Sequence, residues 1–130
     1  MIVPDASVIL ELLLRTRNAA RLEDRLFGHN ETLHAPHLLD IEVAQVLRRY
    51  GARGELSPAR GQEALDVLAR FPIARYAHQP LLSRVWALRA NLTAYDAAYV
   101  ALAEGLGATL LTRDARLAKA PGHRAAIELT

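Results

Sequence analysis

The sequence predicts an α/β fold in three layers, with a short-stranded, mainly parallel sheet flanked by helices. The main observation is that short apolar runs alternate with longer segments whose apolar residues recur at helical spacing. The second is that no repeat, linker or low-complexity stretch interrupts this alternation. Because the chain has 130 residues, enough for one domain and short for two, we expect residues 1–130 to form a single domain.

The composition allows a sizeable core without cross-links. Hydrophobic residues make up 52% of the chain and cysteine is absent, which excludes disulfides and thiolate metal sites. The longest clean apolar run, Ala97 to Ala103, is far below the roughly 18 residues of a membrane span. The opening MIVPDAS lacks the basic and apolar regions of a signal peptide. We therefore expect a soluble cytoplasmic protein that does not contact a membrane.

The charge pattern suits a polyanionic partner. The net charge is +2, and all but one of the 16 basic residues are arginines, Lys119 being the exception. If four of the 14 acids gather in one site, the remaining surface carries a net charge of +6. A basic surface around an acidic pocket suits a nucleic acid that must reach bound cations. Codon bias in a GC-rich genome is the alternative explanation of the arginines.

The first half of the chain predicts strand, acid and helix in succession. Ile2 to Pro4 is a short apolar strand whose proline is tolerated at the last position. Asp5 or Ser7 is suited to cap the helix that follows, and capping is the alternative role for Asp5. Further elements are a helix over Asn18 to Phe27 closed by Gly28, a strand over Thr32 to Ala35, and a helix over His37 to Tyr50 with Pro36 at its first position.

The helix from His37 to Tyr50 carries an acid at the edge of its apolar stripe. The stripe consists of Leu39, Val43, Val46, Leu47 and Tyr50. Glu42 lies at its edge, where an acid either reaches solvent or points into a shared cleft. Asp40, at the other edge, is the rival acid.

The second half predicts the same alternation. The expected elements are a helix over Ala59 to Arg70 capped by Ser57, a strand over Ile73 to Tyr76, a helix over Leu81 to Arg89 with Trp86 in the core, a helix over Thr93 to Glu104 ended by Gly105 and Gly107, a strand over Ala108 to Thr112, a turn of helix over Ala115 to Ala118, and a strand over Ala125 to Leu129. The apolar helices Val8 to Leu14 and Ala59 to Leu68 are candidates for a subunit interface.

Acidic residues fall where this fold gathers functional groups. Asp5 and Asp114 follow strands, and Asp96 lies in the first turn of a helix. Parallel sheets bring strand ends and helix starts to one edge, and Glu42 belongs to the same edge. Acids without a lysine partner repel one another, and Mg²⁺ or Mn²⁺, which prefer oxygen ligands, relieve that repulsion. Helix capping for Asp96 and a turn for Asp114 are the alternatives.

Four sequence blocks resemble a PIN domain, and more closely a VapC-type toxin of a bacterial toxin–antitoxin pair. The blocks are Asp5-Ala6-Ser7, Glu42 in its helix, Tyr95-Asp96-Ala97-Ala98-Tyr99 with Ala101-Leu102-Ala103-Glu104, and Leu111-Thr112-Arg113-Asp114 with Leu117. The last two blocks are the specific part. The resemblance implies the PIN-like three-layer fold and metal-dependent cleavage of RNA.

The resemblance also implies roles for individual residues. Asp5, Glu42, Asp96 and Asp114 match the catalytic acids that hold Mg²⁺ or Mn²⁺, and Ser7 and Thr112 match supporting hydroxyls. Some relatives carry another acid after the last aspartate, where this chain has Arg116. Arg89 and Arg113 are near the acids in sequence and are candidates for contacting RNA phosphates.

The predicted function is that of a Mg²⁺- or Mn²⁺-dependent endoribonuclease, the toxin of a type II toxin–antitoxin system. The expected partners are RNA, a cognate antitoxin protein, and a second copy of the chain in a homodimer or a toxin–antitoxin hetero-oligomer. A non-catalytic PIN-like module that binds RNA or protein is the alternative. A phospho-acceptor receiver domain fits poorly, because it needs a lysine after a late strand and Lys119 lies beyond Asp114.

Overall fold

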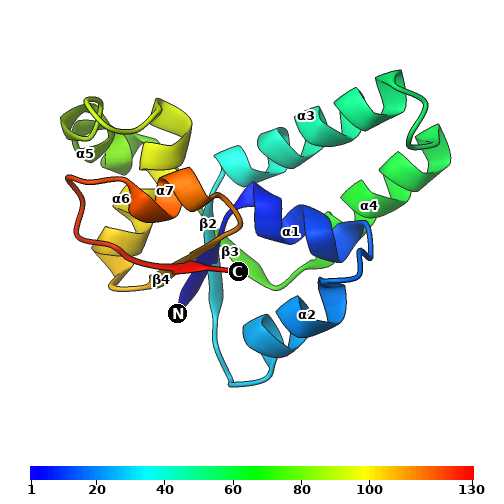
Figure 1. Ribbon diagram of the computed structural model, residues 1–130, viewed down its shortest axis with the longest axis horizontal. Helices are drawn as coiled ribbons and strands as arrows, with labels where there is room; N and C mark the ends of the chain where they lie inside the picture. Colours follow the sequence, from blue (N-terminus) through cyan, green and yellow to red (C-terminus); the bar gives the residue numbers. More distant parts are fainter.

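A computed structural model describes residues 1–130 and contains one five-stranded sheet (Figure 1). The strands are β1 (Ile2–Pro4), β2 (Leu33–Pro36), β3 (Ile73–Tyr76), β4 (Thr109–Thr112) and β5 (Ala126–Leu129). Their spatial order is β3-β2-β1-β4-β5, and every pairing is parallel. The predicted α/β class and parallel sheet are therefore confirmed.

The helices divide between the two faces of the sheet. They are α1 (Ala6–Leu13), α2 (Ala19–Phe27), α3 (Leu38–Ala52), α4 (Pro58–Arg70), the 3-10 turn η1 (Gln79–Leu81), α5 (Leu82–Ala87), α6 (Ala94–Leu106) and α7 (Ala115–Lys119). The helices α1 to α4 connect strands in one direction from β1, whereas α5 to α7 connect strands in the other. Right-handed crossovers then place the two groups on opposite faces, as Figure 1 shows for α1–α4 and α5–α6.

The change of direction beside β1 creates the crevice of the fold. The strands β1 and β4 are neighbours, and their register pairs Pro4 with Leu111. The segment after β1 leads to α1 and the segment after β4 leads to α7, so the two connections diverge to opposite faces of the sheet. Ligands of open α/β sheets bind at such a point. The residues just beyond Pro4 and Leu111 therefore occupy the expected site.

The core covers both faces of this sheet. Val3, Leu110 and Val100 are fully buried, and the hydrophobic cluster also includes Ile9 and Leu12 from α1. The apolar helix segment Val8–Leu14 thus packs inside the subunit, and in α4 Ala64 and Leu68 also belong to the core. The buried side chains of these helices therefore belong to the core, whereas Leu10 of α1, its C-cap Leu14 and Leu65 of α4 are half-buried, so a role of the two helices in a subunit interface stays a prediction.

Three further sequence expectations need correction. Pro36 is the last residue of β2 and does not open α3, which begins at Leu38 after His37. Gly105 lies inside α6, and Gly107 alone ends that helix, with a left-handed φ of 63°. Trp86 is 68% exposed, and the guanidinium of Arg89 lies 4.4 Å from the centre of its ring, so this side chain is outside the core.

No helix in the structure combines the length and the apolar character that crossing a bilayer requires.

Candidate active site

Asp5 lies at the centre of the crevice, between β1 and α1. It is 7% exposed and caps α1, with Oδ1 accepting from the backbone N–H of Val8 at 3.2 Å. The hydroxyl of Ser7 donates to the same oxygen, and the hydroxyl of Thr112 donates to Oδ2. Asp5 therefore does cap α1, the alternative role considered for it, and it also lies in the crevice.

Thr112 connects Asp5 to Asp114. The Thr112 side chain is fully buried at the end of β4. Its hydroxyl donates to Asp5 and accepts from the backbone N–H of Asp114 at 3.0 Å. Ser7 makes a parallel link, because its hydroxyl accepts from the backbone N–H of Arg113 at 3.0 Å. Both hydroxyls predicted as supporting groups therefore tie the end of β1 to the end of β4.

Asp96 and Asp114 line one cavity of about 230 Å³ beside this link. Asp96 lies in the first turn of α6, whose N-cap Thr93 accepts from the backbone N–H of Asp96 at 3.2 Å. Asp114 caps α7, with Oδ1 accepting from the backbone N–H of Arg116 at 2.8 Å. Thr93, and not Asp96, is therefore the N-cap of α6, whereas Asp114, for which a turn was the alternative, caps α7. Both acids nevertheless line the same cavity.

The rival acids of α3, Asp40 and Glu42, have different surroundings. Asp40 forms a two-pronged ion pair with Arg75, at 2.8 Å and 3.0 Å, beside the end of α4. Glu42 is half-buried, and its Oε1 has no hydrogen-bond partner. Asp40 is thus occupied by Arg75, whereas Glu42 has a buried oxygen and remains the candidate for the site.

The acids influence one another's ionisation. Burial, followed by the negative charges of Asp114 and Asp5, raises the pKa of Asp96. Burial raises the pKa of Glu42, the nearby Tyr99 hydroxyl opposes this rise, and the negative charges of Asp96 and Asp5 add to it. Burial also raises the pKa of Asp5, opposed by hydrogen bonds from Ser7 and Thr112. The four acids therefore share one electrostatic environment, in which negative charge is unfavourable unless a cation compensates it.

The donor chemistry of this pocket fits a hard divalent cation. All the candidate donors are carboxylate oxygens, which Mg²⁺ and Mn²⁺ prefer, and Glu42 offers a buried oxygen without a partner. The side chains as placed do not bring three or more His, Cys, Asp or Glu groups into a cluster that holds a metal ion. The residues thus fit Mg²⁺ or Mn²⁺ by chemistry and charge, while a complete ligand set is not assembled.

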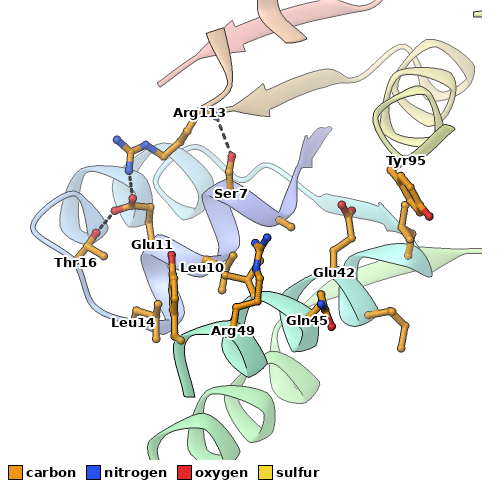
Figure 2. Close-up of a pocket in the computed structure, with 15 residues that line it drawn as sticks. Ser7, Leu10, Glu11, Leu14, Thr16, Glu42, Gln45, Arg49, Tyr95 and Arg113 are labelled. Atoms are coloured by element: carbon orange, nitrogen blue, oxygen red, sulfur yellow. Dashed lines mark hydrogen bonds and ion pairs between the residues drawn. The ribbon is translucent and has the colours of Figure 1, made fainter. Parts of the chain in front are cut away.

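A larger cleft of about 760 Å³ opens next to the acids, between α1 and α3 (Figure 2). Glu42, Ser7 and Arg113 line it together with Tyr95 and Arg49. Figure 2 shows these side chains around one space, so a polymer bound in this cleft would pass beside Glu42.

The two predicted phosphate-binding arginines have different environments. Arg113 lines the cleft, where it pairs with Glu11, and Glu11 also accepts from Thr16 (Figure 2). Arg89 stacks on Trp86 and is not among the residues that line the cleft. The sequence reasoning missed Glu11, a 15% exposed acid two turns into α1, because helical spacing alone does not reveal a partner more than 100 residues away.

Comparisons with known proteins agree with this geometry. The PIN domain family matches residues 2–123. Ribonuclease VapC9 of Mycobacterium tuberculosis is 47% identical over 117 residues, covering 90% of this chain and 88% of that protein. Ribonuclease VapC12 of the same species is 43% identical over 129 residues, covering 99% of this chain and 98% of that protein.

Solved structures share the fold. PAE2754 from Pyrobaculum aerophilum is 26% identical with a TM-score of 0.73, covering 97% of this chain and 81% of that one. VapBC2 from Rickettsia felis, solved with a DNA fragment from its promoter, is 14% identical with a TM-score of 0.73, covering 99% of this chain and 98% of that one. At this level of identity the second likeness concerns the fold alone.

Proposed function

The chain belongs to the PIN-domain family and is related to VapC ribonucleases over most of its length, and from this premise we propose how its own residues cleave RNA. The activity is metal-dependent endoribonuclease activity, and the proposed ligands of Mg²⁺ or Mn²⁺ are Asp5, Glu42, Asp96 and Asp114. The observation that carries the assignment is that Thr112 links Asp5 to Asp114 and that Asp114 lines one cavity with Asp96. The negative charges of Asp96 and Asp5 also raise the pKa of Glu42, so this acid lies near them.

The chain's own groups have distinct tasks in this reaction. A bound divalent cation supplies charge that polarises a phosphodiester and makes a water molecule nucleophilic at neutral pH. Asp5 is the most restrained acid, since Ser7, Val8 and Thr112 all donate to it, so it fixes the position of the site. Asp96 and Asp114 face the shared cavity, where the phosphate backbone approaches. No side-chain nucleophile is needed, because water is the attacking group.

The cleft between α1 and α3 is the proposed path of the RNA. Arg113 and Arg49 line it, and both offer positive charge to phosphates beside the acids. Arg113 must exchange its partner Glu11 for a phosphate, whereas Arg89, stacked on Trp86, is the weaker candidate.

Partner proteins follow from the family. We propose that a cognate antitoxin binds this chain and blocks the acid pocket, and that the toxin associates into a homodimer or a toxin–antitoxin hetero-oligomer. The surface offers apolar side chains for such contacts, since Ile41, Leu82, Trp86 and Tyr95 are all more than half exposed. At α1, Leu10 and the C-cap Leu14 are half-buried and line the cleft, so they also remain available for such a contact.

The test is cleavage of RNA by the purified protein with Mg²⁺, Mn²⁺ or EDTA, followed by mapping of the cut ends. We expect Asp96→Asn to lower the cleavage rate at least 100-fold while the fold, followed by circular dichroism, is retained. Asp66→Asn is the matched control, because Asp66 lies on α4 and contacts only Gln62, at 2.9 Å. Full activity of Asp96→Asn, or cleavage that persists in EDTA, would contradict the proposal.

The melting temperature in the presence of Mn²⁺ distinguishes a metal-dependent enzyme from the non-catalytic alternative. A site that binds divalent cations stabilises the folded chain as the cation concentration rises. We therefore expect Mn²⁺ to raise the melting temperature of the native protein and of Asp66→Asn, but not that of Asp96→Asn. A scaffold without a metal site would show no response in any of the three.

A further inference from the structure

Tyr99 carries a buried hydroxyl on α6, the helix that also carries Asp96. Its side chain is 2% exposed, and its hydroxyl forms no hydrogen bond of normal geometry. Tyr99 follows Asp96 by three residues on α6, so the two side chains leave the same face of the helix, one turn apart. Buried hydroxyls in folded proteins nearly always have a partner, so this one calls for an explanation.

Glu42 offers an acceptor that matches this donor. Oε1 of Glu42 is a buried acceptor without a donor, and the Tyr99 hydroxyl is a buried donor without an acceptor. After burial itself, the negative charge of Glu42 and the proximity of Glu42 as a hydrogen-bond acceptor raise the pKa of Tyr99 most, followed by the charges of Asp5 and Asp96. The hydroxyl therefore lies at the acid pocket and stays protonated, able to donate.

The other nearby acids, Asp5 and Asp114, already accept hydrogen bonds from other groups. Both oxygens of Asp5 already accept hydrogen bonds, one from Ser7 and Val8 and the other from Thr112. Asp114 is occupied in capping α7. Glu42, on a longer side chain that has no other restraint in the structure, is the carboxylate that a hydroxyl can orient.

We propose that Tyr99 is a positioning residue whose hydroxyl donates a hydrogen bond to Glu42 and holds this carboxylate toward the divalent cation. The inference rests on the proposed function, in which Glu42 is a ligand. Outer groups that orient metal ligands typically change metal affinity 10- to 100-fold when they are removed. Tyr99 therefore acts through Glu42 and contacts neither the cation nor the RNA.

The test measures Mn²⁺ binding directly, from the electron paramagnetic resonance signal of free Mn²⁺, without RNA. The proteins are the native chain, Tyr99→Phe, Glu42→Gln and the double variant. The matched control is Tyr76→Phe, because the Tyr76 hydroxyl has a formed hydrogen bond to His34, at 2.7 Å, on a different part of the sheet. Circular dichroism confirms the fold, which Tyr99→Phe retains since the ring stays in the core.

We expect Tyr99→Phe to raise the Kd for Mn²⁺ about tenfold, and Tyr76→Phe to leave it unchanged even if it lowers the melting temperature. In the Glu42→Gln background, Tyr99→Phe has no further effect, because the group it orients is already lost. An unchanged Kd for Tyr99→Phe, or effects that multiply in the double variant, would overturn the inference. If Glu42→Gln itself binds Mn²⁺ normally, it is the ligand assignment under the proposed function that fails.

Discussion

The hydroxyl of Thr112 gives the sharpest test of how the site is built. It is fully buried, donates to the carboxylate of Asp5 and accepts from the backbone N–H of Asp114 at 3.0 Å. Thr112→Val keeps the shape of the side chain and removes both hydrogen bonds. A hydrogen bond to a charged group contributes about 1.5–3 kcal/mol and a neutral one about 0.5–1.5 kcal/mol. We therefore expect the free energy of unfolding to fall by about 2–4 kcal/mol.

The assay is urea unfolding at pH 7 in EDTA, so that cation binding does not contribute to stability. For a chain of this length each kcal/mol corresponds to roughly 3–5 °C, so the melting temperature should fall by about 6–20 °C. Thr112→Ser is the control, because it keeps the hydroxyl and loses one buried methyl group, which costs about 1 kcal/mol.

The ordering of the two variants decides the reasoning. Serine must be the better tolerated replacement, although it is less like threonine in volume than valine is. If Thr112→Val were as stable as the native chain, or more stable than Thr112→Ser, the hydroxyl would not be the link between β1 and β4 that the hydrogen bonds indicate.

The remaining predictions concern the contribution to stability of two residues outside the candidate active site, Glu104 and Gly107. Hydrogen bonds from Arg84, followed by the backbone N–H of Arg124, lower the pKa of Glu104 to about 2 from its usual 4.5. A lowered pKa contributes stability that is present above pH 4.5 and is lost as the pH falls toward 2. Glu104→Gln should therefore lower the melting temperature at pH 7 and make the melting temperature depend less on pH between 4.5 and 2. A decrease in melting temperature that is equal at pH 7 and pH 2.5 would contradict this. Gly107 has φ 63° and open space around its Cβ position, so Gly107→Ala should cost about 1 kcal/mol through backbone strain alone, and Gly107→Asn less, as measured by urea unfolding.

Much of the fold follows from local pattern. The alternation of short apolar runs with amphipathic segments predicted every strand to within one residue, because strands buried in a parallel sheet need continuous apolar stretches. The positions of Asp5 and Asp114 after strands, and of Asp96 in a helix start, followed from the same pattern. What pattern could not supply is the connection through Thr112 and Ser7, although their residue types drew attention to them.

Errors arose where a residue's environment depends on distant segments. Trp86 has the large apolar side chain typical of a core residue, yet it lies on the surface of the short helix α5, against Arg89. The apolar residues of α1 and α4 are equally compatible with a core and an interface until the sheet beneath them is known. Pro36 suits both the end of a strand and the start of a helix, and its pairing with Tyr76 of β3 decided for the strand.

By itself, the sequence determined an α/β chain that delivers acids to one edge of a parallel sheet, because strand direction and helix starts are local properties. Only the tertiary structure decided which acids of α3 and α1 have partners. Asp40 pairs with Arg75 and Glu11 pairs with Arg113, while the half-buried Glu42 forms no ion pair with an arginine. The physical reason is that burial and ion pairing depend on contacts between segments far apart in the chain, which linear spacing does not encode.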